Sequence, residues 1–175
     1  STGATNINLA GQTGITTIES FGSAHTGALT FQNVSAVTDV SLNNVSSSGT
    51  QTVTYTTAAV AGSADTQNIS LNTASNTGLT TIAGVETVAI TASNTSQLNL
   101  LAAAASTVTV NAADATTLTL SNAGNTSLTT VTGSGVGAVT YVVDYNLAEL
   151  SLTGGAGNDT FDVSANALAA LDSLD

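Results

Sequence analysis

The stretch that decides the fold is "ASTVTVNAADATTLTLSNAG", residues 105 to 124. It contains two short runs, "VTV" (108–110) and "LTL" (118–120), in which apolar and hydroxyl side chains alternate. Alternation with a period of two is typical of a β-strand that buries one face and exposes the other. The small residues between the runs are typical of a turn. The stretch therefore predicts two short strands joined by a tight connection.

The same unit recurs along most of the chain. Between Ile69 and Leu128 the units begin at residues 69, 79, 88, 98, 108, 118 and 128, a spacing near ten. A strand this short is not stable alone, but a regular array can bury one continuous core when its units stack. The remaining units are "INL" (7–9), "ITTI" (15–18), "LTF" (29–31), "VSL" (40–42), "VTY" (53–55), "VTY" (139–141) and "LSL" (150–152).

Two all-β architectures fit this array. In a parallel β-solenoid each coil takes about twenty residues and two strands, so the chain would form about eight or nine coils. In a β-sandwich similar strands pair antiparallel, with turn signals every 8–12 residues. We favour the solenoid over residues 1–153, because the spacing is nearly constant and the chain lacks the Asn-Gly and Asp-Gly turns of hairpins. Irregular gaps before residue 69 predict loops that bulge from some coils.

The composition excludes several classes of partner. The 175 residues include eleven acids, one histidine and no Lys or Arg, for a formal charge of −11. Nucleic acid is excluded, because the phosphate contacts that dominate its binding need cations. Membrane insertion is also excluded, since the longest apolar run, "LNLLAAAAS" (98–106), is too short to span a bilayer. The acids must be solvated, hydrogen-bonded to the backbone, or neutralised by bound cations.

One segment has the chemistry of a calcium turn. It is "GGAGNDTFD" (154–162), followed by Val163. Calcium takes six to eight oxygen ligands, many of them backbone carbonyls, and glycine lets carbonyls converge. Asp159 supplies an anionic oxygen, while Phe161 and Val163 predict a return to strand. The candidate ligands are Gly154, Gly155, Gly157, Asn158, Asp159 and Asp162; an ordinary glycine-rich turn is the alternative.

One such turn supplies too few oxygens for calcium, about three or four. The others would come from Asp162, Asp144, Asp172 or sequence beyond residue 175, so we expect a weak or incomplete site in this chain. The final segment, "SANALAALDSLD" (164–175), places Leu168, Leu171 and Leu174 three apart after Ser164. This spacing predicts a short helix or a connecting segment that leads to further repeats.

The turn resembles the RTX nonapeptide, Gly-Gly-x-Gly-x-Asp-x-(large apolar)-x, at every defined position. "GLTTIAGVETVAITAS" (78–93), the stretch at 105–124 and the end of the chain also resemble RTX-containing bacterial S-layer proteins of the alphaproteobacterial type and large RTX surface adhesins. The resemblance implies a fragment of a longer chain, exported by type I secretion, that folds on calcium outside the cell and assembles on the bacterial surface. Its partners would be copies of itself and, through other parts of the parent chain, cell-surface polysaccharide.

Catalysis is the first competing function. The only histidine, His25, could act as a base with Asp39 or Glu19 orienting it, but nothing resembles a nucleophile elbow. Paired carboxylates could cleave glycosidic bonds on a β-helix, as in pectin-degrading enzymes. Those enzymes bind a polyanionic substrate, and a chain without Lys or Arg has no cation to hold it. We therefore expect no enzyme activity. His25 is interpreted as a histidine of a surface loop.

Ice binding and an adhesin stalk also compete with the S-layer role. An outward Thr-x-Thr ladder suits ice, and we expect Thr107 and Thr109 to stack near Thr117 and Thr119, with Thr129 and Thr140 beyond. Gln97 and Asn99 would interrupt that ladder. A stalk would share the fold, calcium and location of an S-layer protein but would not pack into a lattice. We favour a calcium-stabilised S-layer module, and leave open whether Asp65, Glu86 and Asp114 bind further ions.

Overall fold

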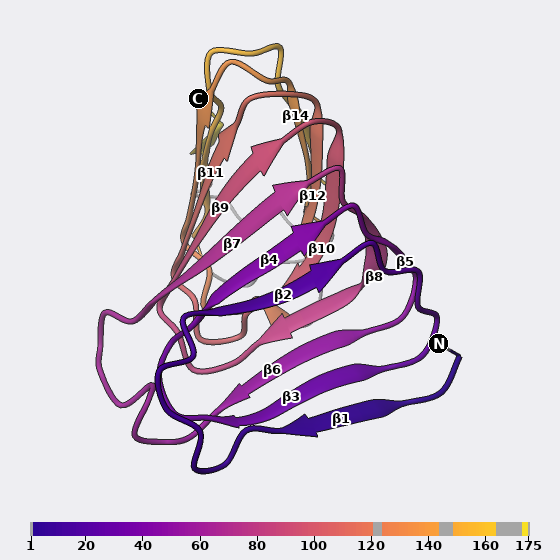
Figure 1. Ribbon diagram of the computed structural model, residues 1–175. Helices are drawn as coiled ribbons and strands as arrows, with labels where there is room; N and C mark the ends of the chain where they lie inside the picture. The colour runs from indigo at the N-terminus through magenta and orange to yellow at the C-terminus, as the bar shows by residue number, and fades with distance from the viewer. Residues whose placement is uncertain (1, 121–123, 144–148, 164–172, 175) are drawn as a thin grey trace.

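The chain is a parallel β-solenoid, which confirms the predicted fold class (Figure 1). The computed structural model describes residues 2–120, 124–143, 149–163 and 173–174. It has about seven turns, fewer than the expected eight or nine. The shortest coils follow the predicted period, as in the pairing of Leu98 with Leu118. Others are longer, as in the pairing of Val40 with Ile69, because loops and bends are inserted at the corners.

Two parallel sheets make up the solenoid, and the chain alternates between them. Figure 1 shows the coils following one another from the broad N-terminal end to the narrow C-terminal end. Sheet A contains β1 (Thr5–Asn8), β3 (Leu29–Val34), β6 (Gln51–Tyr55), β8 (Ser75–Ile82), β10 (Ser96–Leu101), β12 (Thr116–Leu120), β14 (Val139–Val143) and β16 (Thr160–Val163), with the short β5 (Ser46–Ser47) beside β8. Sheet B contains β2 (Thr17–Phe21), β4 (Asp39–Asn43), β7 (Thr66–Asn72), β9 (Thr87–Ser93), β11 (Thr107–Ala112), β13 (Thr130–Gly135), β15 (Ser151–Thr153) and β17 (Ser173–Leu174).

The core lies between the sheets and is built from the inward positions of each strand. In β11, Val108 and Val110 are buried while Thr107 and Thr109 face outward, as the alternation predicts. The register aligns these positions from coil to coil, so that Val108 pairs with both Val88 and Val131. Burying a Val or Leu side chain stabilises the fold by about 1.5–3 kcal/mol. One continuous core therefore runs through the stack.

Asparagines reinforce a corner that follows the sheet B strands. Asn94 Nδ2 donates to Asn72 Oδ1 (2.6 Å), and Asn72 Nδ2 donates to Asn43 Oδ1 (3.1 Å). Asn43 Nδ2 in turn donates to Glu19 Oε1 (3.4 Å), so the amides form a directed chain that ends on a carboxylate. Asn44 and Asn94 have positive φ there, a conformation that asparagine tolerates better than most residues.

The last part of the predicted division, residues 164–175, falls mostly on residues that the structure does not describe. Residues 164–172 and 175, on which the expected helix or connection falls, lie outside the described residues. Ser173–Leu174 form β17, which pairs in parallel with Ser151–Leu152 of β15. A helix long and apolar enough to cross a bilayer is not found among the described residues.

Candidate functional site

The glycine-aspartate turn joins β15 of sheet B to β16 of sheet A, and Asp159 fixes its shape. Asp159 Oδ2 accepts a hydrogen bond from the Gly155 N–H within the turn (2.7 Å). Asp159 Oδ1 accepts a second bond from the Val139 N–H of the preceding coil (2.8 Å). Hydrogen bonds to an ionised carboxylate are stronger than those between neutral groups. The side chain therefore links two successive coils at the point where the chain changes sheets.

Those two bonds leave part of the carboxylate free. An ionised carboxylate offers about four lone-pair sites, and the two N–H donors occupy only two of them. The free lone pairs of this carboxylate are the kind of ligand that a hard cation such as calcium prefers, so Asp159 could supply one anionic oxygen. The residues fit calcium only in part, because the described residues bring one carboxylate to the turn, whereas calcium prefers six to eight oxygens.

The glycines of the turn have a different role from the predicted one. Gly154, Gly155 and Gly157 all have φ values outside the left-handed region, so conformational freedom does not explain them. Instead, the turn packs directly on the coil before it. A Cβ at Gly155 would lie 3.0 Å from the Gly135 carbonyl oxygen, and one at Gly157 would lie 2.6 Å from the Gly137 carbonyl carbon. A side chain at Gly157 would collide with the preceding coil and one at Gly155 would be tight, so close stacking of the backbones explains these two glycines, whereas Gly154 makes room for the Asp159 side chain.

Gly154 and Gly155 lie against the Asp159 carboxylate, but no second acid gathers there in the described residues. Asp162 occupies an exposed position on β16, while Phe161 and Val163 pack against the core as predicted. The described residues contain no group of three or more His, Cys, Asp or Glu that could hold a metal. Asp144 and Asp172, which could complete the site, lie outside the described residues. Asn158 remains a candidate through its position in the turn.

Tyr141 is a residue of this region that the sequence pattern does not identify. It is fully buried on β14, stacks on Phe161 with ring centroids 5.2 Å apart, and has no hydrogen-bond partner for its hydroxyl among the described residues. Burial, reinforced by the charge of Asp159, raises the pKa of Tyr141 to about 12. A side chain on Gly133 would collide with this hydroxyl, so that glycine makes room for it.

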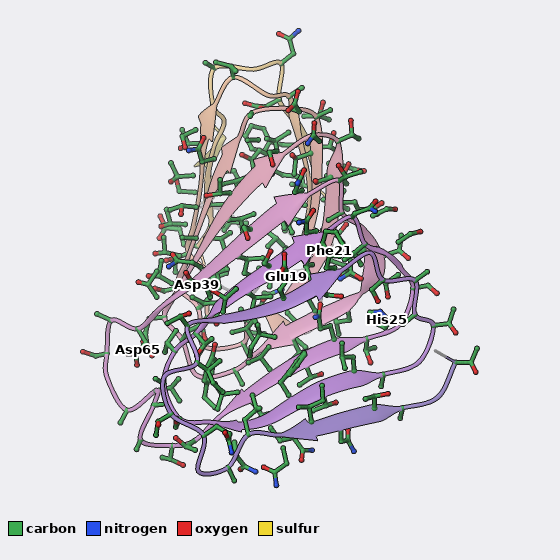
Figure 2. All side chains as sticks on the ribbon, in the orientation of Figure 1. Glu19, Phe21, His25, Asp39 and Asp65 are labelled. Carbon is green, nitrogen blue, oxygen red and sulfur yellow. The ribbon has the colours of Figure 1, made fainter. Side chains whose placement is uncertain are left out.

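Three other acids also accept hydrogen bonds from a neighbouring coil. Asp114 Oδ2 accepts from the Asn94 N–H (2.9 Å), and Glu86 Oε2 accepts from the Asp65 N–H (2.8 Å). Asp39 Oδ1 accepts from the Asn68 side-chain amide (2.9 Å). Hydrogen bonds from the backbone, one of the three expected outcomes, are therefore found for Asp114 and Glu86, whereas Asp39 is bonded to a side-chain amide. Figure 2 shows Asp39 and Glu19 along sheet B and Asp65 on a projecting loop.

His25 is buried in the fold, contrary to its interpretation as a histidine of a surface loop. Only 7% of its surface is exposed, and burial lowers the pKa of its imidazole. Its Nδ1 lies 3.2 Å from Ser23 Oγ. Glu19 and Asp39, the two acids considered as its orienting partners, hydrogen-bond instead to residues of the next coil. The described contacts therefore contain no acid–histidine pair.

A bend that the sequence analysis missed surrounds His25. Three coils share a pattern in which a glycine lies between two inward residues: "HTGAL" (25–29), "SSGTQ" (47–51) and "NTGLT" (76–80). Their glycines stack, since a Cβ on each would collide with the backbone of the glycine one coil earlier. Where the pattern ends, β8 carries extra residues relative to β10 and the register shifts between Leu98 and Asn99. The glycine at the centre of each of these three five-residue stretches is the sequence signal that could have predicted the bend.

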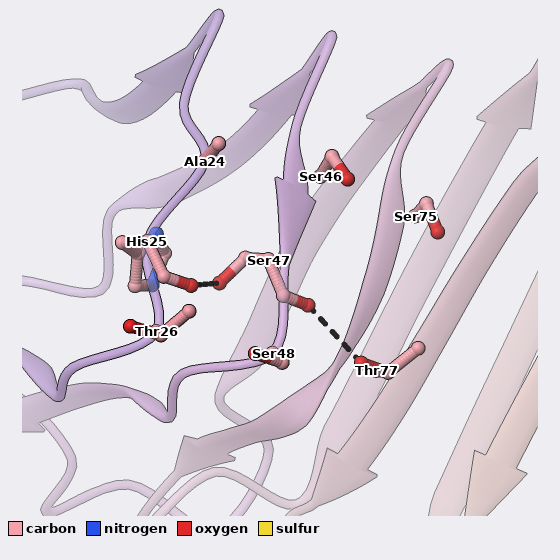
Figure 3. Close-up of a pocket in the computed structure, with 8 residues that line it drawn as sticks. All are labelled: Ala24, His25, Thr26, Ser46, Ser47, Ser48, Ser75 and Thr77. Atoms are coloured by element: carbon pink, nitrogen blue, oxygen red, sulfur yellow. Dashed lines mark hydrogen bonds between the residues drawn. The ribbon is translucent and has the colours of Figure 1, made fainter. Parts of the chain in front are cut away.

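A shallow pocket of about 270 Å³ lies outside this bend (Figure 3). Its lining is neutral and rich in hydroxyl groups. Ser47 Oγ donates to the His25 carbonyl (2.8 Å), and Thr77 Oγ1 donates to the Ser47 carbonyl (3.3 Å). A second pocket, of about 250 Å³, lies on the other side of His25, beside Gly3 and Gly27. The residues that line the first pocket are Ala24, His25, Thr26, Ser46, Ser47, Ser48, Ser75 and Thr77.

The predicted threonine ladder is wrong in its pairing. Thr107 and Thr109 lie on β11 of sheet B, whereas Thr117 and Thr119 lie on β12 of sheet A. Successive units alternate between sheets, so threonines ten residues apart cannot stack. The true neighbours of β11 on sheet B are Thr130 and Thr132, followed by Ser151 and Thr153.

In comparisons with known proteins, no protein-family model, no curated protein and no solved structure matches the chain.

Proposed function

We propose that the chain is a structural, calcium-stabilised module of a secreted bacterial surface-layer protein of the RTX type. The observation that carries this proposal is the position of Asp159, whose carboxylate joins two successive coils at a glycine-rich turn. A cation bound there would stabilise the stack itself, since it would hold one coil against the next. Folding would then depend on the calcium concentration outside the cell.

Assembly into a sheet is supported by the surface chemistry. Every formally charged side chain is acidic at pH 7, so copies of the chain repel one another. A divalent cation between copies would remove that repulsion. The outward positions of β11 and β13, which include Thr107, Thr109, Thr130 and Thr132, carry neutral hydroxyl groups that can hydrogen-bond laterally. The proposed location is the bacterial cell surface.

Thermal unfolding in EGTA and then in millimolar calcium tests the cation site. A ligand at one hundred times its Kd raises the free energy of unfolding by about 2.7 kcal/mol. We expect calcium to raise Tm in the native chain and much less in Asp159→Asn. The matched control is Asp39→Asn, which removes a carboxylate bonded only to the Asn68 side chain and should retain the calcium response.

A second substitution tests the shape of the turn while keeping the Asp159 carboxylate. Gly155→Val should distort the turn and reduce the calcium response, because its Cβ would press on Gly135 and Ser134. An equal rise in Tm for the native chain, Asp159→Asn and Gly155→Val would refute the site at residues 154–159. Electron microscopy of the calcium-loaded samples then distinguishes the two surface roles, since ordered sheets support an S-layer and isolated rods support an adhesin stalk.

Ice binding is a second candidate, because the strand register of sheet B aligns hydroxyl side chains on adjacent strands. Thr107-x-Thr109, Thr130-x-Thr132 and Ser151-x-Thr153 form a ladder of hydroxyl groups over three adjacent strands of sheet B. The ladder is interrupted at β9, where Ala89 pairs with Thr109. Thermal hysteresis of the native chain tests this role directly, and its absence removes the candidate.

A further inference from the structure

The interior of the N-terminal coils contains buried polar atoms that have no protein partner. Among the described residues these include His25 Nε2, both amide atoms of Gln51 and Asn76 Oδ1. The side chains are almost fully enclosed, with 1% of Gln51 and 1% of Asn76 exposed. Native proteins rarely leave buried polar groups without a partner, and ordered water is the usual solution.

The three residues belong to the bend that recurs at residues 25–29, 47–51 and 76–80. Register pairs Ser47 with Asn76, and Gln51 with Thr80. Asn76 Nδ2 donates to Thr80 Oγ1 across the bend (2.8 Å), which leaves Asn76 Oδ1 as the unpartnered atom. The unpartnered atoms therefore come from three successive coils: His25 and Asn76 hold the first position of the bend, and Gln51 holds the fifth, beside Thr80.

The chemistry of these atoms restricts what can bind them. Gln51 Nε2 can only donate, whereas Gln51 Oε1 and Asn76 Oδ1 can only accept. A metal cation cannot satisfy the donor, and an anion cannot satisfy the acceptors. Reversing either amide exchanges the two roles and leaves the same mixture of needs. The occupant must be a small neutral molecule that both donates and accepts hydrogen bonds.

The two pockets that flank His25 do not include Gln51 or Asn76 in their linings. They are lined by hydroxyl and backbone groups, and His25 belongs to both linings. The unpartnered atoms are therefore enclosed, so their occupant must be small, and water is the smallest molecule with the required chemistry. We propose that the interior of the solenoid at this bend, on the inner side of β3, β6 and β8, is a hydration site in which ordered water bonds to His25, Gln51 and Asn76.

Water contacts in solution test this site without any substitution. In the labelled native chain, we expect rotating-frame Overhauser cross-peaks between long-lived water and both the Gln51 side-chain amide and the His25 ring. Gln51→Leu should abolish the cross-peaks to His25 and lower Tm by several °C, because it removes satisfied hydrogen bonds. Gln97→Leu is the matched control, since Gln97 faces outward on β10 and its loss should leave the water signals unchanged.

Two results would overturn the proposal. A dry cluster would show no water cross-peaks, and Gln51→Leu would then raise Tm, because it would replace an unsatisfied buried amide by an apolar side chain. A resident polyol would appear in native mass spectrometry as a retained mass after extensive dialysis, and would show that water is not the occupant. The test does not involve calcium, so its result is independent of the proposed function.

Discussion

The two halves of the solenoid differ in what fills the inner side of sheet A. In the C-terminal half, register stacks Leu98, Leu118, Tyr141 and Phe161 in one inward column. In the N-terminal half the same column continues through Asn76 and Ser47. The neighbouring column changes in the same way, from Leu120 and Leu100 to Thr80 and Gln51. One backbone architecture thus holds two inward columns that are apolar at the C-terminal end and polar at the N-terminal end, beside a hydrophobic core that runs through both.

The difference shows that strand stacking does not require the same side-chain chemistry throughout. Parallel ladders connect the coils in both halves, so the backbone hydrogen bonds are shared. In the C-terminal half, burial of leucine and valine adds the main side-chain contribution. In the N-terminal half, stacked glycines let the bends approach, and side chains such as Ser47 bond to the backbone across coils. The two halves should therefore respond to different kinds of substitution.

The largest effect is expected from Gly78→Val in the polar half. A Cβ at this position would collide with the Gly49 carbonyl and would lie 2.5 Å from its carbon, so two coils would have to separate. We expect a loss of about 4 kcal/mol or more in the free energy of unfolding, measured in urea. Gly3→Val is the control, because a Cβ there has no atom within 4 Å. Similar losses for the two variants would contradict close stacking of the bends.

A smaller loss is expected from Leu118→Ala in the apolar half. Leu118 is 1% exposed and lies between Leu98 and Tyr141 in the inward column. Truncation should remove about 2–4 kcal/mol, from lost burial and from the cavity that remains. Thr119→Ala, at the adjacent outward position, should change stability by less than about 0.5 kcal/mol. Equal effects of the two variants would show that this half is not held by its core.

The sequence predicted the apolar half of the fold better than the polar half. Strict alternation in "VTV" and "LTL" identified both the strands and their buried faces, because a parallel stack repeats one register. Alternation did not reveal the bend at residues 76–80, since Asn76 and Thr80 point inward although they are polar. It also could not assign strands to sheets, and this led to the wrong threonine ladder.

The candidate turn was predicted in position but not in mechanism. The pattern Gly-Gly-x-Gly-x-Asp correctly marked the turn between two strands, and Phe161 and Val163 return to the core as expected. The pattern could not show that Asp159 binds backbone N–H groups of two coils. Nor could it show that Gly155 and Gly157 serve close stacking, because that depends on Gly135 and Gly137 in another coil.

The smallest effect concerns protonation in the polar half. His25 is buried and its pKa is lowered, mainly by desolvation, so the unfolded chain binds a proton more readily than the folded chain does. Stability is therefore fully present above the unfolded value of about 6.5 and falls as the pH decreases from 6.5 towards the lowered pKa. Thermal unfolding between pH 7 and 5 should show this decline in the native chain, whereas His25→Gln should decline much less there, because the substitution removes the titrating imidazole. An identical decline in both proteins would place the titrating group elsewhere. A decline confined to the native chain would show that burial of His25 makes the stability of the solenoid depend on pH.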